Sequence, residues 1–79
     1  MFNIFKGRVK TEKEIEIDGL KKELKECEFL LFRNDIIFNM ATDDMLIEAK
    51  IYEREALLRQ YNYLMIRLKG KQKETVAIE

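Results

Sequence analysis

The sequence predicts an all-α protein, an antiparallel hairpin of two long helices that forms a four-helix bundle by dimerisation. Of its 79 residues 47% are hydrophobic and 38% are charged, and the chain has no proline and only three glycines. This composition is typical of long amphipathic helices. Two apolar patterns with helical spacing are separated by a short polar stretch at residues 39–44. Because the connection is this short, the two helices are expected to be antiparallel neighbours.

The composition also narrows the class of protein. A single cysteine rules out an intramolecular disulfide, and the lack of histidine removes the commonest zinc ligand and general base. We therefore expect no enzyme, no cofactor and no metal site. Cys27 lies on an apolar seam, where an inert buried thiol is favoured over a catalytic or redox-sensing one.

Charge and hydropathy favour a soluble, cytoplasmic protein. Lysine plus arginine and aspartate plus glutamate number 15 each, so no net field draws the chain toward nucleic acid or opposes association. The longest apolar runs, such as 29–32, are four residues long, whereas a membrane span needs about 20. The N-terminus also lacks the apolar region of a secretory signal.

Residues 1–10 are expected to form a basic, aromatic-bearing N-terminal arm, because Gly7 interrupts any helix there. Thr11 and Glu14 have the spacing of a capping box, in which each side chain accepts a hydrogen bond from the other residue's backbone. The first helix is therefore predicted over 11–39.

One apolar seam runs along this first helix with alternating spacings of three and four, as in a coiled coil. Its members are Ile17, Leu20, Leu24, Cys27, Leu31, Asn34 and Phe38. Asn34 either fixes the register or oligomeric state, or lies at the edge of a drifting seam. Gly19 either permits a close helix contact or marks a weak start of the helix.

The polar stretch predicts the end of one helix and the start of the next. Asn39 can adopt the left-handed conformation that closes many helices. Thr42 or Asp43 can cap the second helix, and a capping role for Asp43 and Asp44 is favoured over a metal or catalytic pair. The second helix is predicted over 43–69, ending before Gly70, with a polar C-terminal tail over 70–79.

The second helix has two apolar stripes, which is more than one partner helix can cover. We expect the extra stripe to form an interface between chains or to another protein, most simply in a homodimer. The tyrosines at 52, 61 and 63 are expected to pack rather than to stack on bases. The first stripe comprises Met45, Ala49, Tyr52, Ala56, Tyr63 and Ile66. The second, the predicted interface, comprises Ile47, Ile51, Leu58, Tyr61, Met65 and Leu68, and Leu46, Leu57 and Leu64 lie between the two.

Folding the hairpin gathers positive charge at the end opposite the connection. The residues are Lys6, Arg8, Lys10, Arg67, Lys69, Lys71 and Lys73. A solvated helix end is the simpler interpretation, and the alternative is a peripheral accessory protein that contacts an anionic membrane surface or nucleic acid. The leading hypothesis is a non-catalytic adaptor that self-associates.

Part of the second half resembles a known family. The residues that carry the resemblance are Phe38-Asn39, Thr42-Asp43, Leu46-Ile47, Ile51-Tyr52-Glu53 and Tyr61-Asn62-Tyr63-Leu64. They resemble the YaaL-like family, small proteins of Gram-positive bacteria for which no activity is assigned. Many relatives have proline where this chain has Asp44, and both residues suit the first turn of a helix. The resemblance implies a small helical bacterial protein and supplies no catalytic residue.

Overall fold

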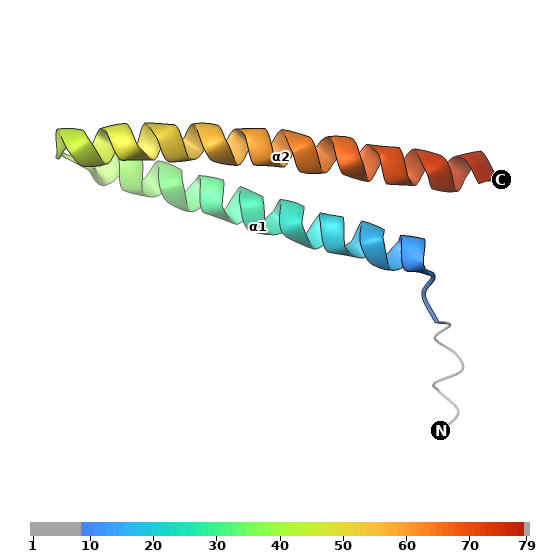
Figure 1. Ribbon diagram of the computed structural model, residues 1–79. Coiled ribbons are helices and arrows are strands. Elements are labelled where there is room, and N and C mark those ends of the chain that lie inside the picture. Colours follow the sequence, from blue (N-terminus) through green and yellow to red (C-terminus); the bar gives the residue numbers. More distant parts are fainter. Residues whose placement is uncertain (1–8, 79) are drawn as a thin grey trace, which may run out of the picture.

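The computed structural model describes residues 9–78, with side chains through residue 73. Two α-helices, α1 (Glu12–Met40) and α2 (Asp44–Ile78), lie side by side and are joined by one tight connection (Figure 1). The helices are antiparallel, because the connection between them is short and residues far apart in the sequence, such as Cys27 and Leu57, are in contact. The all-α hairpin is confirmed. Residues 1–8 of the predicted N-terminal arm lie outside the described residues.

The start of α1 follows the predicted capping box. The Thr11 hydroxyl accepts a hydrogen bond from the Glu14 amide at 3.1 Å, and the Glu14 carboxylate accepts one from the Thr11 amide at 2.9 Å. Two amide groups that would otherwise lack a partner are thereby satisfied, so the helix begins at Glu12.

The connection between the helices, which we call the corner (residues 41–43), differs from the prediction at Asn39. No described residue has positive φ, and α1 continues to Met40. It ends at Ala41, whose backbone is extended and whose amide donates to the carbonyl of Phe38 at 3.2 Å. Since the chain leaves the helix through extended backbone, no left-handed residue is needed.

The second helix is capped by Asp43. Its Oδ1 accepts hydrogen bonds from the amides of Met45 at 2.7 Å and Leu46 at 3.3 Å. Of the two predicted caps, Thr42 and Asp43, the structure therefore uses the aspartate, which also places negative charge at the positive end of the helix.

The predicted end of the second helix at residue 69, and with it the polar tail over 70–79, is wrong. Helix α2 continues through Gly70 to Ile78. Gly70 does not take the left-handed conformation of a helix stop, and strong helix formers (Lys71, Gln72, Lys73) follow it. Lys71 also forms an ion pair with Glu16 of α1 at 2.8 Å, which holds this extension against its neighbour.

The core is a row of leucines with one cysteine, and it runs from the middle of the hairpin toward the end opposite the corner. We call it the leucine core: Leu20, Leu24, Cys27, Leu57, Leu64 and Leu68. The predicted seam of α1 supplies its half of this core. On α2 the buried positions are Leu57 and Leu64, which the predicted pattern placed between two stripes, together with Leu68.

Candidate interaction surface

The six predicted interface residues of α2 do not share one environment. Leu68 is buried in the leucine core, and Tyr61 and Met65 pack against that core from its edge. Ile47 is half-buried, whereas Ile51 and Leu58 remain exposed at 51% and 37%. The structure thus uses the C-terminal part of this stripe within the chain and leaves Ile51 and Leu58 on the surface.

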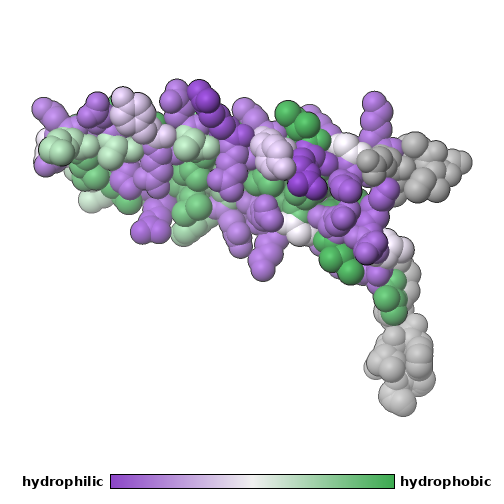
Figure 2. Space-filling view, in the orientation of Figure 1, coloured by the Kyte–Doolittle hydropathy of each residue, from purple (hydrophilic) through white to green (hydrophobic). Residues whose placement is uncertain are grey.

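Exposed apolar side chains concentrate near the corner. We call residues 29–58 the corner half, and residues 12–28 with 59–73 the open half. Of fifteen large exposed hydrophobic residues among the described side chains, eleven lie in the corner half. Figure 2 shows hydrophobic surface over this end of the hairpin, interleaved with hydrophilic side chains. The eleven are Phe29, Leu30, Phe32, Ile36, Phe38, Met40, Met45, Leu46, Ile51, Tyr52 and Leu58.

These side chains surround both helices instead of facing one another. The spacing of Phe29, Phe32 and Ile36 puts them on one face of α1, about half a turn away from the seam that contacts α2. Met45 and Tyr52 follow the spacing of the first predicted stripe of α2, and they are 80% and 63% exposed. Large apolar side chains exposed in such number at one end of a soluble protein favour an interaction site there.

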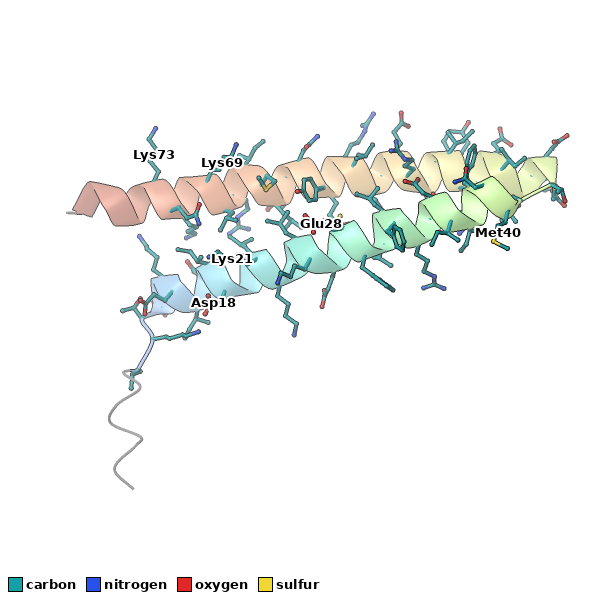
Figure 3. All side chains as sticks on the ribbon, turned by 180° about the vertical axis from the view of Figure 1, so that it is seen from behind. Asp18, Lys21, Glu28, Met40, Lys69 and Lys73 are labelled. Carbon is teal, nitrogen blue, oxygen red and sulfur yellow. The ribbon has the colours of Figure 1, made fainter. Side chains whose placement is uncertain are left out.

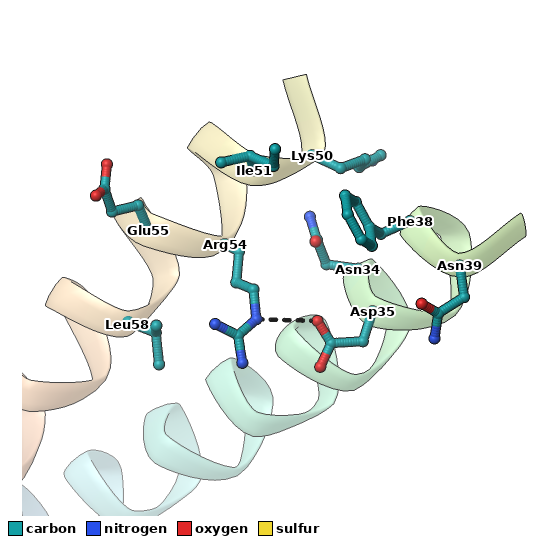
Figure 4. Close-up of a pocket in the computed structure, with 9 residues that line it drawn as sticks. All are labelled: Asn34, Asp35, Phe38, Asn39, Lys50, Ile51, Arg54, Glu55 and Leu58. Atoms are coloured by element: carbon teal, nitrogen blue, oxygen red, sulfur yellow. Dashed lines mark hydrogen bonds and ion pairs between the residues drawn. The ribbon is translucent and has the colours of Figure 1, made fainter. Parts of the chain in front are cut away.

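A groove crosses the corner half between the two helices. We call it the corner groove, with a volume of about 610 Å³. Ile51 and Leu58 of α2 and Phe38 of α1 give it an apolar lining, and an ion pair between Arg54 Nε and Asp35 Oδ1 at 3.0 Å crosses it (Figure 4). The full set of lining residues is Asn34, Asp35, Phe38, Asn39, Lys50, Ile51, Arg54, Glu55 and Leu58.

Asn34 is the most unusual residue of the groove. It is only 2% exposed, so the alternative that it lies at the edge of a drifting seam is wrong. Neither Nδ2 nor Oδ1 of its side chain has a hydrogen-bond partner among the described residues. A buried polar group without a partner costs about 1–3 kcal/mol. Except for Leu57 at its boundary, Asn34 is the one buried residue in the corner half.

The basic end is partly neutralised within the chain. Lys10 forms an ion pair with Asp18, and Lys71 forms one with Glu16. Arg67 donates to the Tyr63 hydroxyl at 3.1 Å and lies over its ring. Lys69 and Lys73 extend from the ribbon at this end, far from Met40 at the corner (Figure 3). Lys6 and Arg8, the other two predicted members, lie outside the described residues.

Cys27 is a buried free thiol of the leucine core. Its thiol donates to the carbonyl of Leu57 at 3.3 Å, and burial, with a smaller contribution from Glu28, raises the pKa of the thiol. The thiolate, which is the nucleophilic form, is therefore disfavoured. Nearby, the Tyr61 hydroxyl donates to the Glu28 carboxylate at 3.1 Å, and this bond raises the pKa of Tyr61.

Within residues 9–78 neither helix combines the length and hydropathy of a membrane span. The same residues contain no group of three or more cysteine, aspartate or glutamate side chains arranged to hold a metal ion. Searches against protein families, curated proteins and solved structures found no match to this chain. The likeness to the YaaL-like family therefore stays a prediction from the sequence.

Proposed function

We propose that this chain is a non-catalytic adaptor that works by self-association, with two hairpins joining through their corner halves in a four-helix bundle. The observation that carries the proposal is the contrast in burial along the hairpin. Eleven large hydrophobic side chains are exposed in the corner half, while only Asn34 and Leu57 are buried there. Burying a large apolar side chain contributes about 1.5–3 kcal/mol, so covering those that line the corner groove, Phe38, Ile51 and Leu58, is favourable.

A second copy of the chain is a suitable cover. Two-helix hairpins complete a common architecture when they pair into a four-helix bundle, and two-fold dimers are the commonest oligomers. The formal net charge of zero does not oppose the approach of two copies. A chain of this size also rarely gains more than about 3–5 kcal/mol from its own core, so added burial matters to its stability.

The experiment measures absolute molar mass by light scattering after size exclusion, over a hundredfold dilution series. We expect a dimer that dissociates only toward the lowest concentrations. The double variant Ile51→Asp with Leu58→Asp should shift the dimer–monomer midpoint to at least tenfold higher concentration, because carboxylates would be buried in the interface. Both residues are exposed in the single chain, so the hairpin itself should still fold.

Ile66→Asp is the matched control. Ile66 is 71% exposed on the same helix, but it lies in the open half. It should leave the molar mass unchanged. A wild-type chain that stays monomeric at every concentration, or a double variant with the wild-type dilution curve, would contradict the proposal.

A further inference from the structure

The side-chain amide of Asn34 is buried beside the corner groove without a hydrogen-bond partner. An asparagine side chain carries two N–H donors and a carbonyl acceptor. In one chain both polar atoms are buried and find no partner among the described residues. Figure 4 places this side chain between the helices, next to Phe38 and facing the turn of α2 that carries Lys50 and Ile51. The site is therefore chemically incomplete in a single hairpin.

We propose that a second copy of the chain completes it: two corner grooves face each other in antiparallel orientation, and the two Asn34 amides hydrogen-bond across the two-fold axis. This inference rests on the proposed self-association and adds its register. An amide is self-complementary, because the N–H of each copy can reach the carbonyl of the other. The pairing requires the amide to rotate about its own side-chain bonds, from its buried position between the helices into the groove that Asn34 lines.

A single polar residue in an apolar seam is a known means of fixing register and oligomeric state. Pairing of two amides at one level satisfies both, whereas a shift of the copies by one turn leaves both buried and unpaired. The apolar members of the groove, Phe38, Ile51 and Leu58, can pack in several registers and do not select one. Asn34 is therefore the residue of the groove that fixes the register between the two copies.

Charge favours the antiparallel orientation over the parallel one. Asp43 in the corner, with Asp44 and Glu48 in the first turns of α2, gives this end of the hairpin a negative charge, and no lysine or arginine lies between residues 39 and 49. Parallel copies would bring two such corners together, and like charges at close range repel. In the antiparallel orientation the two acidic corners point away from each other.

The antiparallel orientation also brings each acidic corner to a compatible surface. Met40, the last residue of α1, is six residues beyond Asn34, so each corner begins about 9 Å past the two-fold axis. Arg54 lies four residues beyond Lys50, about 6 Å past the axis in the other copy. The Arg54 side chain is 51% exposed and makes one bond to Asp35, and the remaining donors of its guanidinium can bind a second carboxylate. The four charged residues of the groove, two of each sign, do not repel the corner.

Cross-linking tests the register with three variants that each carry one new cysteine. Lys50 lies opposite Asn34, so the proposed two-fold axis passes at the level of Lys50. Ile51 is one residue from that level, so two Ile51→Cys residues would be offset by only about 3 Å along the helix direction. Leu58 is eight residues from that level, which puts two Leu58→Cys residues about 24 Å apart. Tyr52→Cys lies on the same helix but does not line the groove. With a short bismaleimide we expect at least tenfold more cross-linked dimer for Ile51→Cys than for the other two.

The wild-type chain controls for the native thiol. Cys27 is 2% exposed and donates to Leu57, so the wild type should give no cross-linked dimer. The inference would be overturned if a dimeric chain cross-linked best through Leu58→Cys or Tyr52→Cys, and the proposed function would survive that result. A chain that is monomeric by light scattering would instead overturn the proposed function itself.

Asn34→Leu separates a register role from a purely structural one. Replacing this buried amide by an apolar side chain should raise the melting temperature under either role, because an unpaired amide is costly and a paired one in an apolar seam still costs stability. If Asn34 sets the register, the Ile51→Cys cross-link should fall at least threefold in the Asn34→Leu background while the molar mass still exceeds that of a monomer, because apolar packing persists without register. An unchanged cross-link yield would show that Asn34 does not set the register.

Discussion

The open half of this hairpin has fewer apolar side chains than the corner half, yet it contains most of the buried ones. In the open half leucines face one another across the two helices, and charged residues cover the outside. In the corner half apolar side chains surround both helices, and the one buried side chain apart from boundary Leu57 is an amide. The leucine core of the open half therefore holds the two helices together, whereas the corner half leaves apolar surface exposed.

The largest expected effect is a core truncation in the open half. Leu64 is 3% exposed at the centre of the leucine core. Leu64→Ala removes buried methyl groups and leaves a cavity, which costs about 2–5 kcal/mol, comparable to the whole stability expected of a chain this small. Thermal unfolding followed by circular dichroism should show a variant that is largely unfolded at 37 °C.

Leu46→Ala is the matched truncation in the corner half. Leu46 is 40% exposed on the same helix. At concentrations where the protein is monomeric we expect a change within about 0.5 kcal/mol, as for other surface substitutions. A loss as large as that of Leu64→Ala under those conditions would break the comparison, because it would mean that both halves hold the single chain together.

The fold was largely predictable because its signals are local. The capping box at Thr11 and the three-four spacing of Leu20, Leu24 and Cys27 depend on near neighbours in sequence. The end of α2 was not predictable from Gly70 alone. A glycine stops a helix only when the backbone turns left-handed, and here the flanking helix formers and the contact with Glu16 oppose that turn.

The candidate surface was predictable only in part. The sequence indicated that α2 has more apolar surface than one partner covers, but it did not show which stripe α1 would take. The spacing of Leu57, Tyr61, Leu64 and Leu68 matches the seam of α1 and could have indicated the inner face. The loss of both hydrogen-bond partners at Asn34 depends on what lies opposite it in space, and no local pattern reports that.

The second-largest expected effect tests whether α2 continues past Gly70. Gly70→Ala should stabilise the protein by about 1 kcal/mol, because alanine is the better helix former and a Cβ at this position meets no atom within 4 Å. If α2 ended at a left-handed Gly70, the same change would destabilise it. Gly19→Ala, in equally open surroundings on α1, is the control and should give a gain of similar size in chemical denaturation.

The smallest effect concerns the ion pair that closes the open half. Lys71 donates to Glu16 at 2.8 Å and lowers the pKa of that carboxyl below its usual value. The unfolded chain therefore binds the proton more readily, so the pair contributes stability above the ordinary glutamate pKa of about 4.3 and loses it as the pH falls through the lower, folded-state value. Lys71→Gln should flatten this part of the curve of melting temperature against pH, whereas Lys73→Gln, an exposed position two residues on, should keep the wild-type slope. Identical slopes for Lys71→Gln and wild type between about pH 5 and pH 3 would mean that this contact adds nothing to the open half, which would then depend on its leucines alone.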